Sequence, residues 1–311
     1  MTASAPFRVR VPASAAHLGP GFDLLALALA LYYEVQVEPE QDGGLRVESG
    51  GQLRDLQVAP DDDLLVRGLR AVFARRDAQP PALLLRATSE IPVARGLGSS
   101  AAALLAGTLV GERLLRQSPT LDERARALEP IEGHYENLAA ALTGGLVAAV
   151  TEPDEPRDRV TILPLELHDA WKLVVVWPGL QLAASAVRRL LPATVRHGLV
   201  ARSTGRTLLL LRGLRDGDPE LLARGLRDEV HVPYQARAVP GLTEVFEAAS
   251  EAGAAGATLA GSGPAAIAFV HGLERGNDVL MAMCEAFQKQ GMTAAGRVLE
   301  PAVDGARILP A

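Results

Sequence analysis

The most informative stretch of the chain is Ile91-Pro-Val-Ala-Arg-Gly-Leu-Gly-Ser-Ser-Ala-Ala-Ala103. An apolar run, residues 83–85, precedes it, and an alanine- and leucine-rich run, residues 101–115, follows it. This order predicts a strand, then a loop of glycine and serine, then a helix that begins where the loop ends. Gly96 and Gly98 allow the backbone to turn tightly and to approach a ligand closely, because neither carries a Cβ atom.

The predicted start of this helix is suited to binding phosphate. Ser99 or Ser100 is expected to be the N-cap. The first N–H groups of a helix have no partner within it, and the helix dipole adds partial positive charge there. A helix N-terminus of this kind attracts phosphate groups. The alternative is an ordinary capped loop, because a short motif has little specificity on its own.

Two common phosphate motifs do not fit the stretch. A P-loop requires a lysine directly after its last glycine, and the two lysines of the chain, Lys172 and Lys289, lie far away. The glycine spacing also resembles a dinucleotide-binding fingerprint, in which one strand leads straight into the loop and another strand follows the helix. Pro92 interrupts the first strand, and residues 120–123 form a capping box that opens another helix instead.

The composition indicates a globular protein of two domains. Hydrophobic residues make up 48% of the chain and charged residues 22%, with a formal net charge of −6. No basic cluster suggests a nucleic-acid partner. The single cysteine, Cys284, excludes an internal disulfide and a cysteine-based zinc site. Neither a signal sequence nor a membrane-spanning apolar run is recognised, so we expect no membrane partner and a soluble, cytoplasmic protein.

Two further loops carry glycine at either end of the chain. Residues 7–11 alternate like a strand and lead into residues 12–23, a loop of proline, glycine and serine that ends at Asp23. Asp23 is either a simple turn cap or a functional carboxylate. Residues 256–269 read as a strand, a glycine turn and a second strand. This turn contains Gly261, Ser262 and Gly263.

A polar cluster follows the central loop and its helix. Glu132, His134, Glu136 and Asn137 occur within residues 132–137. A zinc site would require a second histidine at close spacing, and this segment has one. Glu132 with a serine hydroxyl would suit Mg²⁺, which prefers oxygen ligands. His134 either takes part in a binding site or only braces the loop, and the sequence favours neither role.

Residues 151–158 are polar and contain prolines, so they are the best candidate for a domain boundary. Residues 61–63 are three aspartates before an apolar helical face, where the helix dipole favours acidic side chains. Further helices are expected at residues 203–214, 219–228, 240–252 and 278–290, and a last strand is expected near residues 297–299.

The three glycine loops resemble, in order, the three motifs of the GHMP kinases (galactokinases, homoserine kinases, mevalonate kinases and phosphomevalonate kinases). The first loop, which ends in Gly-Phe-Asp23, is most similar to that of the homoserine kinase family. The resemblance implies an α+β fold of two domains. Residues 1–155 would form a ribosomal-S5-domain-2-like domain that carries ATP, and residues 156–311 would form a ferredoxin-like domain.

The resemblance also implies an activity. The γ-phosphoryl group of ATP would be transferred to the side-chain hydroxyl of L-homoserine, giving O-phospho-L-homoserine for threonine synthesis. ATP and Mg²⁺ would be the cofactors, and the main partner would be this small-molecule substrate. Because the family is often dimeric, a homodimer is one expected assembly.

Matching positions imply roles for particular residues. The catalytic residues would be Asp23, Glu136 and Asn137. ATP would contact Asp63, Pro92, Arg95, Gly96, Leu97, Gly98, Ser99, Ser100 and Ala101. Mg²⁺ would bind Ser100 and Glu132. The substrate would contact His17, Asp23, His134, Asn137, Arg188, Gln235, Arg237, Gly261, Ser262 and Gly263.

Four of these positions depart from the homoserine kinase pattern. His17 and Asp63 each stand where that pattern has Asn, and Gln235 stands where it has a second arginine for the substrate carboxylate. Glu136 replaces an Asp that is catalytic in many GHMP kinases, so the general base stays open. Two alternatives also stay open: a kinase for another small alcohol, and a binding protein of this fold that has lost catalysis.

Overall fold

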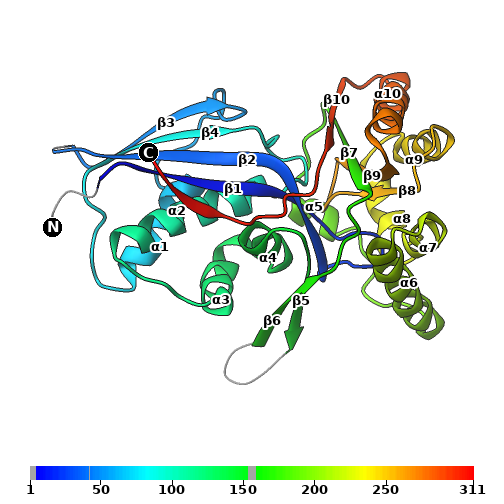
Figure 1. Cartoon of the computed structure of the whole chain (residues 1–311), viewed down its shortest axis with the longest axis horizontal. Coiled ribbons are helices and arrows are strands. Elements are labelled where there is room, and N and C mark those ends of the chain that lie inside the picture. The colour runs from blue at the N-terminus through cyan, green and yellow to red at the C-terminus, as the bar shows by residue number, and fades with distance from the viewer. Residues whose placement is uncertain (1–4, 42, 153–158) are drawn as a thin grey trace.

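Two packed units of mixed helix and strand form the structure, a computed structural model that describes residues 5–41, 43–152 and 159–311 (Figure 1). The first unit is a large sheet with helices on one face. The second is a smaller sheet with its own helices. The predicted α+β fold is therefore confirmed.

A seven-stranded sheet forms the first unit. Its strands are β1 (Phe7–Ala16), β2 (Leu25–Pro39), β3 (Leu45–Gly51), β4 (Leu83–Ser89), β5 (Leu146–Glu152), β6 (Arg159–Leu165) and β11 (Arg307–Pro310). The order is β11-β1-β2-β4-β3, and β5 pairs with both β2 and β6. β1 is longer than predicted, because it continues after a register shift between Pro12 and Ala13. Residues 12–16, which were predicted as part of the first glycine loop, are therefore strand, and that loop begins after Ala16.

Helices cover one face of this sheet (Figure 1). They are α1 (Leu64–Ala74), α2 (Ser99–Leu114), α3 (Leu121–Glu132) and α4 (Glu136–Thr143). The predicted capping box is present at the start of α3. The predicted serine N-cap of α2 is wrong: the cap is Gly98, with a φ of 67° and no side-chain cap bond. A left-handed turn is needed there, which glycine adopts without strain.

The second unit is a four-stranded antiparallel sheet in the order β10-β7-β9-β8. Its strands are β7 (Trp171–Pro178), β8 (Gly256–Leu259), β9 (Ala266–His271) and β10 (Ala294–Leu299). Its helices are α5 (Ala184–Arg188), α6 (His197–Asp216), α7 (Pro219–Gly225), α8 (Val232–Gln235), the 3₁₀ turn η1 (Ala236–Ala238), α9 (Leu242–Glu251) and α10 (Leu273–Lys289). In the described ranges, none of the helices is both long and apolar enough to cross a bilayer.

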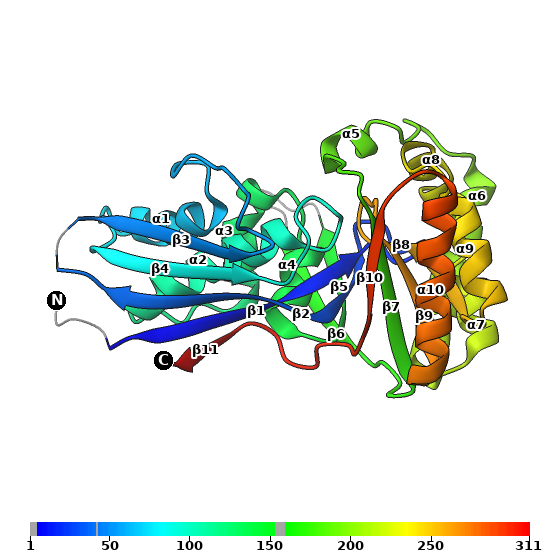
Figure 2. The ribbon, with the colours of Figure 1, turned by 90° about the horizontal axis from the view of Figure 1, so that it is seen from above.

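Alternate residues of β7 join two apolar cores. Leu173 and Val175 belong to a core that continues through the first unit, whereas Val174 and Val176 pack with residues of α9 and α10. This division follows from the alternation of side chains along a strand. Figure 2 shows α9 and α10 on the outer side of the sheet. The opposite face of this sheet therefore contributes to the core that continues into the first unit.

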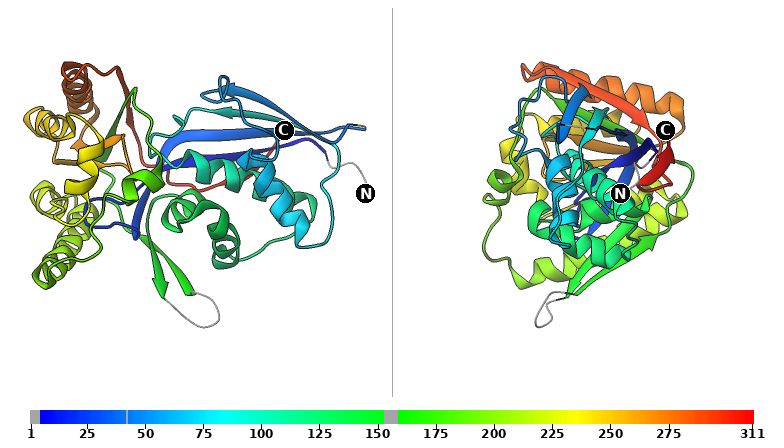
Figure 3. Two further views of the ribbon diagram at one scale, coloured as in Figure 1. Left: turned by 180° about the vertical axis from the view of Figure 1, so that it is seen from behind. Right: turned by 90° about the vertical axis from the view of Figure 1, so that its left-hand side faces the viewer.

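The predicted boundary between residues 155 and 156 lies outside the described residues, and the division into 1–155 and 156–311 stays a prediction. Two strands from the second half of the chain complete the first sheet. β6 pairs with β5, and β11 pairs with β1 (Figure 3). The predicted last strand corresponds to β10. β11 was not predicted, because it is a short, largely exposed edge strand without a clear apolar alternation.

Candidate active site

Backbone hydrogen bonds join the central and third glycine loops to the end of β1, which leads into the first glycine loop, at one place between the two units. The N–H of Ser14 donates to the carbonyl of Leu97 at 3.2 Å. The N–H of Gly261 donates to the last carbonyl of β1 at 2.8 Å, and that of Ala265 donates to the carbonyl of Arg95 at 3.1 Å. Segments that are far apart in the sequence therefore build one site.

Glycine is required at two positions of the central loop. A Cβ on Gly96 would lie 2.3 Å from the carbonyl oxygen of Ala260, and a Cβ on Gly98 would lie 2.1 Å from Oγ of Ser14. Cβ atoms essentially never approach other atoms within 3.0 Å. The central loop can therefore lie against its two neighbours only because these residues have no side chain.

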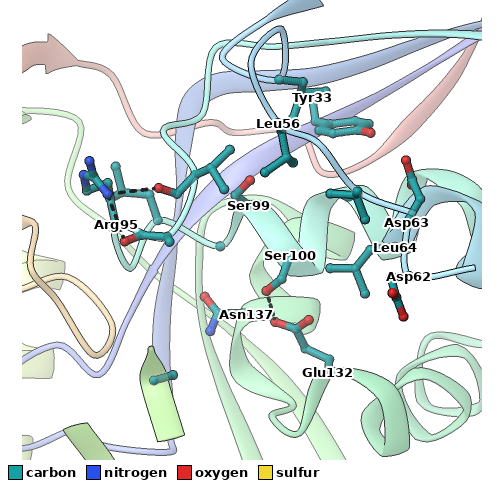
Figure 4. A pocket seen from close by; sticks show the side chains of 18 of the residues that line it. Tyr33, Leu56, Asp62, Asp63, Leu64, Arg95, Ser99, Ser100, Glu132 and Asn137 are labelled. Atoms are coloured by element: carbon teal, nitrogen blue, oxygen red, sulfur yellow. Dashed lines mark hydrogen bonds between the residues drawn. The ribbon is translucent and has the colours of Figure 1, made fainter. Parts of the chain in front are cut away.

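A cavity of about 1000 Å³ opens beside this junction, a volume that suits a small-molecule ligand. Its middle is lined by residues 93–100, and its polar end by His17, His134 and Asn137. Its apolar end is lined by Tyr33, Leu53, Leu56, Val58, Leu64 and Val66. Figure 4 shows Tyr33 and Leu56 to one side of Ser100 and Arg95 to the other. The sequence did not identify the apolar wall, which becomes visible only when β2 meets the segment before α1.

Asp63 lies at the apolar end and is also the N-cap of α1. Its Oδ1 accepts hydrogen bonds from the backbone N–H groups of Leu65 at 2.8 Å and Val66 at 3.3 Å. We expected Asp63 to contact ATP, and in the structure it both caps α1 and lines the cavity, which Asp62 also lines. One carboxylate thus serves the helix and the pocket.

Arg95 brings positive charge to the middle of the cavity. Its Nη1 reaches the carbonyls of Val93 and Ala94 at 3.3 and 3.4 Å, and its buried Nε has no hydrogen-bond partner among the described residues. Burial lowers the pKa of Arg95, but from a value so high that the guanidinium stays charged. An anionic ligand would supply the partner that this side chain needs.

Ser100 and Glu132 face each other in the cavity, as Figure 4 shows. Ser100 Oγ donates to Glu132 Oε1 at 2.7 Å. Burial raises the pKa of Glu132 to about 7, and the hydrogen bond from Ser100 offsets only part of this effect. A hydroxyl and a carboxylate are oxygen ligands of the kind that Mg²⁺ prefers. The residues present therefore fit the predicted metal site.

Glu136 and Asn137 begin α4, and Asn137 lines the polar end of the cavity. Asn137 Oδ1 accepts from the hydroxyl of Ser14 at 2.8 Å, and Asn137 Nδ2 donates to Glu136 Oε1 at 3.3 Å. Only 2% of Glu136 is exposed, and burial raises the pKa of its carboxyl to about 7. A carboxyl group with a pKa near neutrality can act as a general acid or base at physiological pH.

His17 lies against Glu136 and is neutral. Its Nδ1 accepts from the backbone N–H of Asp23 at 2.9 Å, which places the proton of the neutral ring on Nε2. Burial lowers the pKa of His17 to about 3 despite the nearby charge of Asp23. His17, Asp23 and Glu136 are close enough to hold a metal ion. They do not fit one, because one ring nitrogen accepts a hydrogen bond and the other carries the proton.

Aromatic side chains complete the polar end. Phe22 stacks on His17 with ring centroids 4.4 Å apart, and on His231 with centroids 4.2 Å apart. A carboxylate oxygen of Asp228 accepts from the backbone N–H of His231 at 2.8 Å. We gave no role to His231, nor to Phe22, although Phe22 lies next to Asp23 in the first glycine loop. Only the fold shows that these two residues touch.

Asp23 and Arg188 form an ion pair that bridges the two units. Arg188 ends α5, and its Nη1 and Nη2 each donate at 2.7 Å to one carboxylate oxygen of Asp23. Burial acts to raise the pKa of Asp23, but the hydrogen bonds and the charge of Arg188, together with His17 and His134, outweigh it and hold this pKa below its usual value. The two predicted substrate-binding charges are therefore adjacent.

Two predicted substrate-binding residues lie away from this cluster. Gln235 is buried in α8, whereas Arg237 is exposed with its guanidinium 5.1 Å from the centre of the Tyr234 ring. Neither lines the cavity, and Asp23, Glu136 and Arg188 do not line it either, but those three adjoin its polar end through His17. Residues two positions apart in a helical turn face different directions, so the two side chains cannot both reach the site.

The other predicted residues divide into two groups. Pro92 and Ala101 are buried and support the central loop without lining the cavity. The cavity-lining residues are Arg95, Gly96, Leu97, Gly98, Ser99, Ser100, Gly261, Ser262 and Gly263. A loop with free N–H groups, an oxygen pair for a cation and a buried carboxyl together form the parts that phosphoryl transfer requires.

Comparisons with known proteins agree with this geometry. The family models described as GHMP kinases N terminal domain and GHMP kinases C terminal match residues 63–145 and 210–289. A homoserine kinase of Moorella thermoacetica is 38% identical over 302 residues, which cover 97% of this chain and 99% of the relative. A homoserine kinase of a Synechococcus species is 35% identical, with 97% of both chains covered.

Solved structures show the same fold. The crystal structure of homoserine kinase from Cytophaga hutchinsonii has a TM-score of 0.85 at 23% identity and covers 99% of both chains. The crystal structure of L. major mevalonate kinase in complex with R-mevalonate has a TM-score of 0.69 at 16% identity and covers 97% of both chains. The predicted two-domain fold is confirmed by this likeness.

Proposed function

This chain belongs to the GHMP kinases, within the homoserine kinase family, and we propose that it transfers the γ-phosphoryl group of ATP to the side-chain hydroxyl of L-homoserine. The product is O-phospho-L-homoserine, used in threonine biosynthesis. One observation carries the choice of substrate. Asp23 and Arg188 place an anion and a cation side by side, as the ammonium and carboxylate of an amino acid require, and oxygens of Asp23 and Glu136 lie within 4.8 Å.

ATP would occupy the cavity along its length. The apolar end around Tyr33 and Leu56 would hold the base, since a flat, weakly polar ring gains from burial against such side chains. The triphosphate would lie on the central loop, where the N–H groups at the start of α2 and the unpartnered Nε of Arg95 offer hydrogen bonds to anionic oxygens.

Mg²⁺ would be held by Ser100 and Glu132. A bound cation of this kind neutralises charge on the phosphate oxygens during transfer. The two side chains already lie 2.7 Å apart, so little rearrangement is needed to bring both oxygens to one ion. Their own task is to fix where the charge of the triphosphate is neutralised.

L-Homoserine would bind with its carboxylate on Arg188 and its ammonium on Asp23. A guanidinium binds a carboxylate through two parallel hydrogen bonds, as Arg188 does with Asp23 here. Asn137 would hold the hydroxyl, and Glu136 would accept its proton. The hydroxyl oxygen forms the new bond to the γ-phosphorus, the bond to the β–γ bridging oxygen breaks, and ADP leaves.

The experiment for this proposal is ATP turnover against a panel of small hydroxyl compounds. L-Homoserine should give the highest kcat/KM, and mass spectrometry should find phosphate on its side-chain oxygen. A higher kcat/KM for an alcohol without a carboxylate would establish the second candidate, a kinase for another small alcohol. That candidate is motivated by Gln235, which leaves one carboxylate-binding arginine where the family pattern has two. Absence of turnover with every compound, with ATP still bound, would instead establish a binding protein.

The expected homodimer and cytoplasmic location stay predictions. Sedimentation equilibrium at several protein concentrations measures the first, and fractionation of the source cells measures the second.

A further inference from the structure

Nδ1 of His17 accepts a hydrogen bond from the backbone of Asp23, and its other ring nitrogen, Nε2, lies beside Glu136. Its Nε2 lies 3.9 Å from Glu136 Oε1, and both side chains are only 3% exposed. We propose that His17 is a positioning residue: its Nε2–H orients the Glu136 carboxylate for proton transfer, and the imidazole itself does not bind the substrate. This inference rests on the proposed phosphoryl transfer and goes beyond it, because we had expected His17 to contact the substrate.

Three kinds of contact fix the imidazole ring. Its Nδ1 accepts the N–H of Asp23, one face stacks on Phe22 at an interplanar angle of 20°, and its edge meets His134 with ring centroids 6.3 Å apart. Phe22 is itself held against a second ring. A donor locked in this way can direct a neighbouring group, because its own rotamer does not change.

The contacts of Glu136 show which of its carboxylate oxygens His17 would orient. The Nδ2 of Asn137 donates to Oε1 at 3.3 Å, and Nε2 of His17 approaches the same oxygen. At 3.9 Å the second contact is longer than a hydrogen bond and acts as an attraction between the N–H dipole and the carboxylate. Because both donors interact with Oε1, the other carboxylate oxygen, Oε2, can turn toward the substrate hydroxyl and take its proton.

The charges around Glu136 explain why its carboxylate form needs the N–H donor of His17. The charged groups that act on Glu136 are Asp23, Glu132 and Arg188, and the two histidines nearby are His17 and, at the edge of its ring, His134. Burial and the acidic neighbours disfavour the carboxylate form, which a base must have. A neutral donor stabilises that form without the full charge that would attract the phosphate or the substrate carboxylate to the wrong place.

The test compares two substitutions at one position. His17→Phe keeps a ring against Phe22 but removes both nitrogens, whereas His17→Gln offers an acceptor for the Asp23 N–H and a donor toward Glu136. We expect His17→Phe to lower kcat about tenfold to hundredfold, less than the roughly 10²–10⁴-fold that a general base itself contributes, with KM for homoserine nearly unchanged. His17→Gln should restore most of kcat. Thermal unfolding and ATP binding check that both variants are folded.

The pH profile and a double-mutant cycle separate this role from simple packing. Loss of the donor raises the pKa of Glu136, so the acidic limb of kcat should move to higher pH in His17→Phe and should vanish in Glu136→Gln. In the Glu136→Gln background, His17→Phe should have little further effect on kcat. A rise in KM with an unmoved limb, or an equal loss of kcat in both backgrounds, would overturn the proposal. If the wild type does not phosphorylate homoserine at all, the proposed function fails first, and the same cycle is then run with the accepted alcohol.

Discussion

Arg188 holds Asp23 through two hydrogen bonds of 2.7 Å, although the two residues are separated by 165 positions in the sequence and belong to different units of the fold. Their side chains are 43% and 41% exposed, so the pair itself adds little to the stability of the fold. Its importance is that each group is already aligned for an opposite charge. The carboxylate of an amino acid can take the place of Asp23 on Arg188, and its ammonium can take the place of Arg188 on Asp23.

The first prediction concerns the replacement of this arginine. Arg188→Ala should raise KM for homoserine roughly tenfold to hundredfold, because a charge-assisted hydrogen bond contributes about 1.5–3 kcal/mol. KM for ATP and the melting temperature should change little. Steady-state kinetics with each substrate varied in turn measures the effect, and Arg188→Lys is the matched control, which should retain part of the affinity as a single point charge. An unchanged KM for homoserine in Arg188→Ala would remove the substrate assignment.

The sequence predicted the site to the extent that its parts are local. The glycine loop at residues 91–103, the helix after it and the capping box at Thr120 depend on neighbouring residues, and all three are present. The prediction of a serine N-cap was wrong because the cap position has a left-handed backbone and packs against Ser14 of β1, where only glycine fits. The preference of serine for N-cap positions is a local property, so it could not predict that long-range contact.

The parts that could not be predicted are long-range. Whether Arg188 pairs with Asp23, and whether His231 stacks on Phe22, depends on how two separately folded sheets meet. Burial has the same origin: Glu136 looks like a surface residue at a helix start, yet it is almost fully enclosed. Its altered pKa therefore exists only in the assembled fold.

The second prediction concerns the oxygen pair for Mg²⁺. Ser100→Ala and Glu132→Ala should each lower kcat by about 10²–10³, the usual effect of losing one electrostatic contributor to the transition state. Glu132→Ala should also raise the Mg²⁺ concentration needed for half-maximal rate, and EDTA should abolish the activity of the wild type. Ser99→Ala is the matched comparison: Glu132 accepts its hydrogen bond from Ser100, so loss of the neighbouring Ser99 hydroxyl should lower kcat less than loss of the Ser100 hydroxyl. Near-normal turnover in both variants would contradict the metal assignment.

The third prediction separates the two roles of Asp63. Asp63→Ala should lower the free energy of unfolding by about 0.5–2 kcal/mol, the usual cost of losing an N-cap, and should raise KM for ATP. Asp63→Asn keeps an acceptor for the N–H groups of Leu65 and Val66, so it should retain both stability and KM. Chemical denaturation and ATP kinetics of the two variants measure the outcome. A stability loss in Asp63→Ala without a change in KM would leave this residue as a helix cap alone.

The last prediction concerns the cost of burying Glu136. Its pKa is raised to about 7 by burial in the folded protein, whereas an exposed glutamate in the unfolded chain has a pKa of about 4.3. The folded state therefore binds this proton more tightly than the unfolded state does. It follows that the contribution of this group to the unfolding free energy is fully present below about pH 4 and is lost as the pH rises to about 7. The full loss is on the order of 3 kcal/mol.

Glu136→Gln removes the charge and keeps the shape, so it should be more stable than the wild type at pH 8 and about equally stable at pH 4.5. Denaturation curves of both proteins across this range give the difference, which cancels the titration of every other group that the two proteins share. The same variant should lose most of its kcat, since an amide cannot accept the hydroxyl proton. A gain in stability together with a loss of activity would show that the buried carboxyl is kept for the reaction and not for the fold. A stability difference that does not change with pH would mean that Glu136 titrates as an ordinary surface glutamate, and it would then have no basis as the general base.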